Sequence, residues 1–91
     1  MKYSKFEGIN VVSLDAKDVG EVNGLEIDPK NWKITHINIE LSDNAMKELD
    51  IKKPFMGKVT ICYPVGFIEK VGDVITLSRT VEGLRKVPEC R

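Results

Sequence analysis

The side chains best suited to chemistry are one histidine, His36, and two cysteines, Cys62 and Cys90. A single histidine excludes a metal site with several imidazole ligands, and it leaves a serine–histidine–aspartate triad without a spare base. Cys62 and His36 both occupy expected strand positions, so they could form a nucleophile–base pair. A catalytic thiol, however, needs an electropositive and partly exposed setting. Cys62 has apolar neighbours, which favours a buried, structural cysteine.

The cysteine pattern does not indicate a disulfide framework. Two cysteines are too few for one, and their spacing is not that of a Cys-x-x-Cys motif. We therefore expect Cys62 to be a small buried hydrophobic residue and Cys90 to be a free thiol near the end of the chain. A disulfide between them would require the C-terminal tail to fold back onto the body of the protein.

The charged residues point to no reaction either. The carboxylates are spread through turns without the spacing of a calcium-binding loop, and the glycines form no phosphate-binding series before a helix. The 14 basic residues balance the 14 acidic residues, so no net field attracts nucleic acid. RNA binding remains an alternative because of a scattered basic set: Lys52, Lys53, Lys58, Arg79, Arg85, Lys86 and Arg91. We expect no enzymatic activity, no metal and no cofactor.

Length and hydropathy indicate one small domain in the cytoplasm. The 91 residues suffice for a single core. No apolar run reaches the roughly 18 residues that a membrane span needs. Residues 1–5 carry charge, but no hydrophobic signal-peptide core follows them. A membrane partner is therefore not expected.

The clearest element is a β-hairpin between Val19 and Leu41, which has two strands joined by the turn Asp28-Pro29-Lys30-Asn31. Pro29 fixes φ for the first central turn position, and Asn31 tolerates a left-handed conformation. The second strand alternates between two faces. One face carries Lys33, Thr35, Ile37, Ile39 and Leu41 and should meet the core. The other carries Trp32, Ile34, His36, Asn38 and Glu40 and should meet water or a partner.

Further short strands are expected at 8–14, 58–64 and 71–77, with Pro64 marking an edge or a bulge. Residues 45–49 favour a short helix that the residues 42–44 can cap. Phe55 and Met56 form an apolar loop tip that either plugs the core or makes contacts. The fold class is mostly β: a small antiparallel β-barrel with one or two helical turns. It spans residues 1–77, and a tail at 78–91 can hold a short helix capped by Thr80.

Several of these segments resemble the PRC-barrel family, over about residues 6–77. The most specific parts are Val19-Gly20-Glu21-Val22, the Asp28-Pro29 turn, Tyr63-Pro64-Val65 and Val71-Gly72-Asp73-Val74-Ile75. The insertion at 42–57 looks most like free-standing archaeal members. The family includes the soluble domain of the photosynthetic reaction-centre H subunit and the C-terminal domain of ribosome-maturation factors. These signatures are turn and core residues, so the resemblance implies a fold and no catalytic residue.

The candidate interface is the outward stripe of Trp32, Ile34, His36 and Asn38, together with Phe55 and Met56. Tryptophan is enriched among interface anchors, and two-fold dimers are the commonest closed assemblies. The alternative is that Trp32 packs over the hairpin turn or against the tail. We predict a non-enzymatic protein-interaction module, a homodimer that binds an unidentified protein. An RNA- or ribosome-associated role, implied by the resemblance, is the alternative, and a thiol enzyme is a lesser one.

Overall fold

The computed structural model describes residues 7–52 and 58–87 and has a mostly β fold, as the sequence predicts. Its elements follow the order β1 (Asn10–Val12), β2 (Asp18–Asp28), β3 (Lys33–Leu41), α2 (Asp43–Glu48), β4 (Thr60–Pro64), η1 (Val65–Phe67), β5 (Ile68–Val71), β6 (Ile75–Leu77) and η2 (Glu82–Lys86). The two η elements are 3-10 turns. The predicted hairpin and short helix are both confirmed.

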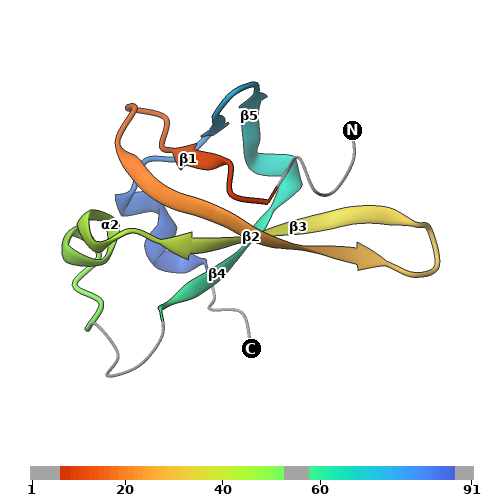
Figure 1. The fold of residues 1–91 in the computed structure, drawn as a ribbon, viewed down its shortest axis with the longest axis horizontal. Helices are drawn as coiled ribbons and strands as arrows, with labels where there is room; N and C mark the ends of the chain where they lie inside the picture. The colour runs from red at the N-terminus through yellow and green to blue at the C-terminus, as the bar shows by residue number, and fades with distance from the viewer. Residues whose placement is uncertain (1–6, 53–57, 88–91) are drawn as a thin grey trace.

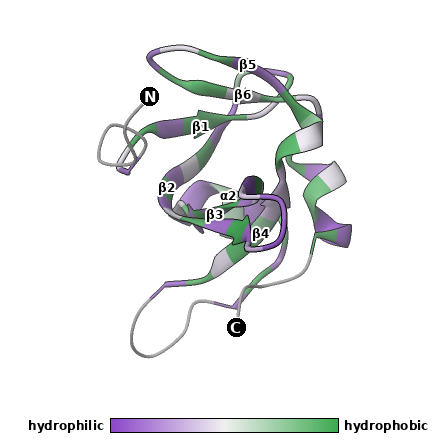
Figure 2. Ribbon diagram, turned by 90° about the vertical axis from the view of Figure 1, so that its right-hand side faces the viewer, coloured by the Kyte–Doolittle hydropathy of each residue, from purple (hydrophilic) through white to green (hydrophobic). Residues whose placement is uncertain are grey.

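The six strands form one sheet in the order β4-β3-β2-β1-β6-β5. The first four make an antiparallel meander, but β1 pairs with β6 in parallel. The prediction of a wholly antiparallel sheet is therefore wrong. The chain reaches the far end of the sheet with β5, turns back into β6, and β6 then runs beside β1 in the same direction. Figure 2 shows how strongly the sheet curls.

The described strands do not close into a barrel, which corrects the second part of the predicted architecture. β4 and β5 are the two ends of the sheet and do not pair with each other. Pro64 ends the β4 ladder because proline has no amide hydrogen to donate. The turn η1 then carries the chain to β5 at the opposite end of the sheet. The prediction that Pro64 lies at an edge is confirmed.

The core lies on the concave face of this sheet, where the strand alternation places the apolar side chains. The fully buried residues include Val11, Val19, Val22, Ile37, Ile39, Leu41, Tyr63, Ile75 and Leu77. The Tyr63 hydroxyl donates to the Phe67 carbonyl oxygen at 2.7 Å, so the phenol is not left unpaired. Burial raises the pKa of Tyr63 above its usual range.

Helix α2 and the C-terminal segment cover one side of this core. The Ser42 hydroxyl accepts from the Ala45 amide at 3.1 Å and caps α2. Met46 and Leu49 are both buried, as their three-residue spacing predicts. In the tail, Val81 and Leu84 are buried in the same core, and the short helix expected there is the 3-10 turn η2. Its N-cap is Val81 and not Thr80, although the Thr80 hydroxyl accepts from the Gly83 amide at 3.3 Å.

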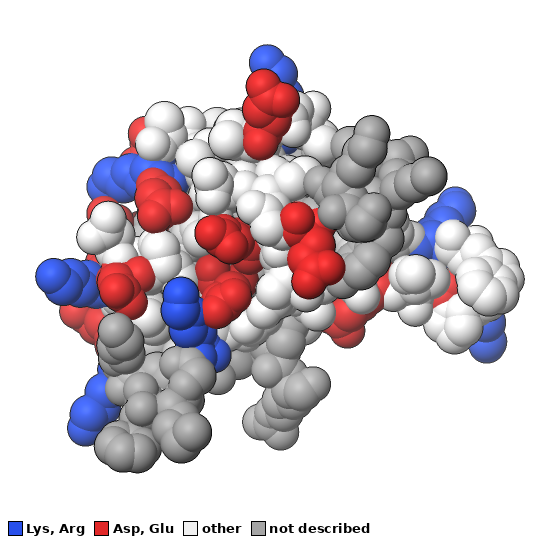
Figure 3. All heavy atoms as spheres, viewed as in Figure 1, with Lys and Arg blue, Asp and Glu red and all other residues white. Residues whose placement is uncertain are grey.

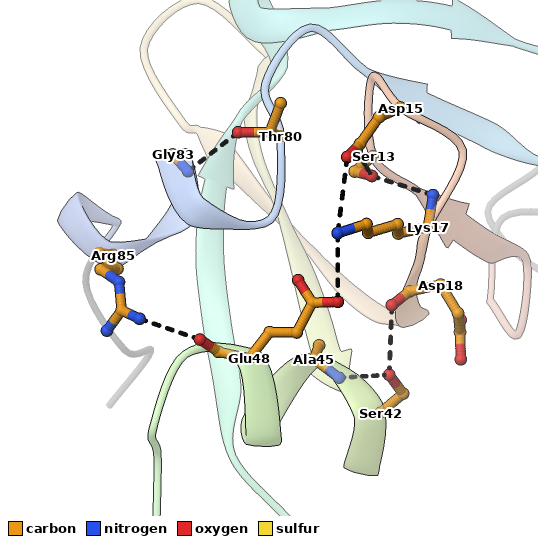
Figure 4. A network of polar contacts seen from close by, with 10 residues as sticks. All are labelled: Ser13, Asp15, Lys17, Asp18, Ser42, Ala45, Glu48, Thr80, Gly83 and Arg85. Carbon is orange, nitrogen blue, oxygen red and sulfur yellow. Dashed lines mark hydrogen bonds and ion pairs between the residues drawn. The ribbon is translucent and has the colours of Figure 1, made fainter.

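Polar contacts join these covering elements to the turn before β2 (Figure 4). The Lys17 ammonium lies 3.4 Å from a Glu48 carboxylate oxygen and 3.8 Å from one of Asp15. Arg85 donates to the carbonyl oxygens of Glu48 and Leu49 at the end of α2, at 2.9 and 3.0 Å. The guanidinium therefore satisfies acceptors that the short helix leaves unpaired.

The predicted strand at 71–77 is interrupted. β5 ends at Val71, a turn follows in which the Gly72 amide donates to the Val74 carbonyl oxygen at 3.0 Å, and β6 begins at Ile75. The turn reverses the chain, so β5 and β6 pair with each other in an antiparallel way. The sequence carries a signal for this turn, since Gly72 and Asp73 are turn-forming residues, and the prediction of one strand over 71–77 overlooked it.

Candidate functional site: the β2–β3 arm

The end of the β2–β3 hairpin projects from the body of the protein (Figure 1). Within the described residues, β4 pairs with β3 only from His36 to Glu40. Residues 26–35 extend past this limit, and we call them the arm. β2 and β3 pair along the arm as far as Asp28 and Lys33. Among the residues that the structure describes, the arm is thus a two-stranded ribbon with no third strand paired beside it.

The loop at the end of the arm is held by Asp28. Its carboxylate accepts from the Lys30 amide and from the Asn31 side-chain amide, both at 2.9 Å. These bonds, the Lys30 amide first, lower the pKa of the Asp28 carboxyl. The Trp32 amide donates to the Asp28 carbonyl oxygen at 2.8 Å and closes the loop. The predicted turn is confirmed.

The left-handed residue of this loop is Trp32, with φ of 54°, and not Asn31 as the sequence suggested. Asparagine and glycine are the residues that accept this conformation most easily. Trp32 is also the most exposed large hydrophobic residue in the described part of the chain, at 82%. Its indole therefore does not pack over the turn or against the described part of the tail.

Two isoleucines add to this apolar surface. Ile27 pairs with Ile34 across the arm, and their exposures are 53% and 41%. The register shifts between Glu26 and Ile27, so that Glu26 pairs with His36 and Thr35 is the extra residue of a β-bulge. Neighbours along a strand alternate and cross-strand partners share a face. Ile27 and Ile34 therefore lie on the same face of the ribbon as the core.

The bulge divides the predicted stripe of β3. Ile34 lies on the core face of the ribbon, while His36 and Asn38 lie on the other, opposite Glu26 and Gly24. Both polar residues are partly buried and engaged: His36 Nδ1 lies 2.9 Å from Thr35 Oγ1, and Asn38 Oδ1 lies 3.6 Å from Cys62 Sγ. The structure thus pairs Ile34 with Ile27 across the arm and places Trp32 in the loop beyond this pair.

The other two interface candidates, Phe55 and Met56, lie outside the described residues. Ile27 was not among the predicted interface residues, because a strand position on the same face as Leu25 does not show that the residue lies beyond the body of the protein. The feature that identifies Ile27 as exposed is the length of the hairpin, because β3 has nine residues and its neighbour β4 has only five.

Cys62 is part of a disulfide and is only partly buried, so the prediction of a small buried hydrophobic residue is wrong. Apolar neighbours in the sequence indicate burial, but they carry no information on the redox state of the sulphur. The other cysteine of the chain, Cys90, lies outside the described residues. A sulphur held in a disulfide is not a thiolate nucleophile, so the pair with His36 lacks its nucleophile in this structure.

The scattered basic residues lie in different settings. Lys58 is 3.9 Å from a Glu40 carboxylate oxygen, Arg79 stacks 4.2 Å from the centre of the Phe67 ring, and Arg85 binds α2. Lys53 and Arg91 lie outside the described residues. In the described part of the chain no group of three metal-ligating side chains gathers. Nor does that part contain a helix both long and apolar enough to cross a membrane.

A scan against family models and a search of curated proteins both return no match for this chain. The resemblance to the PRC-barrel family thus stays a prediction. The site is defined by its own geometry: an apolar ribbon end with a left-handed, exposed tryptophan.

Proposed function

We propose that this protein is a non-enzymatic protein-interaction module and that the arm is its contact surface. The observation that carries the proposal is Trp32, whose indole is exposed and whose backbone is left-handed. Both features are unfavourable for the isolated domain. Non-glycine residues in unfavourable backbone regions cluster at functional sites, where surrounding structure maintains them. Large, rigid aromatic side chains are also typical anchors of protein interfaces.

The rest of the fold supports this proposal by making the arm rigid at its base. Leu25 and Ile37 pair across the ribbon where it enters the body, and Ile37 is fully buried. The Asp28 hydrogen bonds fix the loop at the other end. A contact surface held in this way loses little conformational entropy on binding. We retain the relationship to the PRC-barrel family as part of the proposal, on the sequence motifs alone and with the sheet open as described.

Site-specific photo-crosslinking tests whether the arm contacts protein. A photoreactive amino acid replaces Lys30 in the loop, and a matched variant carries it at Lys70, an exposed lysine on β5. In native cells we expect covalent protein adducts from position 30 and far fewer from position 70. Equal, low yields at both positions would refute the proposal. Adducts to RNA from position 30 would favour the RNA-binding alternative instead.

A further inference from the structure

We propose that the Cys62 disulfide is a redox-sensitive clasp, which fastens the C-terminal end of the chain across the free edge of β4. A dithiol opens the clasp, and a disulfide reagent closes it. This inference is independent of the arm and goes beyond the proposed function. It rests on the identity of the second cysteine, the face of β4 that carries Cys62, and the place of β4 in the sheet.

The partner of Cys62 follows from the composition of the chain. The sequence contains two cysteines, and Cys62 is disulfide-bonded. Within one chain, the second sulphur is therefore that of Cys90, three residues after Val87, which is the last residue that the structure describes. The bond closes a loop that contains β5, β6 and η2. It thus ties the whole C-terminal part of the chain back to β4.

The bond joins the two faces of the sheet. Burial alternates along β4, so the buried Ile61 points into the core and Cys62 points to the opposite face, next to Asn38. Val87 packs against the core and borders the same cavity as Ile61. The chain from Val87 to Cys90 spans at most about 11 Å. A connection this short between the two faces passes around the nearest edge of the sheet, which is β4.

The edge that this connection crosses carries backbone groups that β3 does not bind. β4 is one end of the sheet, and the Leu41 amide donates to the Val59 carbonyl oxygen at 2.9 Å. Bonded and non-bonded pairs alternate along an antiparallel ladder, so Ile61 is bonded to β3 and the Thr60 amide points away from it. Open edges recruit strands of other chains, and proteins commonly cover them. The closed clasp covers this edge, and the open clasp exposes it.

Opening is a thiol–disulfide exchange. A thiolate of the dithiol attacks one of the two sulphurs, the S–S bond breaks, and the other cysteine leaves as a thiolate that takes up a proton. The second thiol of the reagent then displaces the first cysteine. The protein gains two thiols, and the reagent loses two electrons and two protons as it becomes a disulfide. Cys62 is only partly buried, and exposed disulfides are the labile, regulatory ones.

The purified full-length protein tests the clasp by mass spectrometry and amide hydrogen exchange. Proteolysis without reductant should give a linked pair of peptides with Cys62 and Cys90, from protein that migrates as a single chain. Dithiothreitol should then reduce the bond while the far-ultraviolet circular dichroism stays unchanged. By NMR, exchange of the Thr60 amide should become at least about tenfold faster relative to that of Ile61. Global unfolding opens both neighbours together, so their ratio reports the edge alone. Cys90→Ser should show the ratio of the reduced protein with and without dithiothreitol.

A bond from Cys62 to a second chain, or two free thiols in air-oxidised protein, overturns this inference. Complete unfolding on reduction would show a purely structural disulfide, and an unchanged exchange ratio would show that the clasp leaves the edge uncovered. Either result overturns the inference as well. Lys30, the crosslinking position, lies at the far end of the arm, where Figure 3 shows basic side chains. Its adducts are measured separately, so the proposed function can stand when the clasp fails.

Discussion

Replacement of Trp32 by asparagine should leave the fold as stable as it is, although it removes the largest side chain of the arm. The left-handed backbone of Trp32 costs about 1 kcal/mol in a residue other than glycine or asparagine. Asparagine relieves most of this strain. The indole is 82% exposed, so only about 45 Å² of it is buried, which contributes at most about 1 kcal/mol. The two terms offset each other.

Trp32→Ala is the matched comparison, because alanine also removes the indole but keeps the strain. We therefore expect Trp32→Asn to be about 1 kcal/mol more stable than Trp32→Ala, which corresponds to roughly 4–8 °C in melting temperature for a domain of this size.

Thermal unfolding of the two variants, followed by circular dichroism at the same low protein concentration, measures this difference. The control pair is Lys30→Asn and Lys30→Ala, in the same loop but at a residue without positive φ. That pair should differ by less than about 0.5 kcal/mol. If Trp32→Ala were as stable as Trp32→Asn, the backbone at position 32 would not be strained. If both variants lost several kcal/mol of unfolding free energy, the indole would not be exposed as described.

Three further outcomes are expected. Gly20→Ala should destabilise the fold by about 3 kcal/mol or more, because its Cβ would lie 1.9 Å from a backbone oxygen of β3; Gly66→Ala, with open space around it, is the control in a denaturant titration. A reductant should lower the unfolding free energy by about 2–4 kcal/mol through loss of the Cys62 disulfide, and Cys62→Ser should not respond to it. Hydrogen bonds lower the pKa of the Asp28 carboxyl in the folded state. The charged carboxylate therefore stabilises the fold at a pH above the ordinary aspartate pKa of about 4, and this contribution disappears as the pH falls through the lowered pKa of the folded state. Carboxyl chemical shifts measured against pH check this, and a midpoint at or above the ordinary value would contradict it.

Local patterns in the sequence were enough for the hairpin and the helix. Pro29 and Asp28 specify a turn, and Ser42 specifies a helix start, through interactions within four residues of each other. The buried alternation of Ile37, Ile39 and Leu41 follows from the period of a strand. Such features depend on neighbours along the chain, so a single sequence contains them.

Long-range pairing could not be predicted in the same way. The parallel contact of β1 with β6 joins Val11 to Ile75, and no local residue encodes the direction in which distant strands meet. The disulfide at Cys62 is similar, because its formation depends on a distant sulphur and on the redox conditions. The cytoplasmic location expected from the sequence also stays a prediction, since disulfides are uncommon in most reducing cytosols.

The bulge at Thr35 explains why the candidate surface was only partly foreseen. Strict alternation assigns Ile34 to the face of His36, and one extra residue transfers it to the face of Ile27. On that face Ile34 continues the core beyond the point where β4 ends. A domain selected for stability alone could end both strands at Glu26 and His36, or place asparagine at the left-handed position. The chain instead extends an apolar ribbon past its own core and ends it with a strained, exposed tryptophan. The exposure of apolar side chains and the strained backbone of Trp32 both disfavour the isolated domain, and both occur at the same end of the molecule. This coincidence is the reason to look for a partner at the arm.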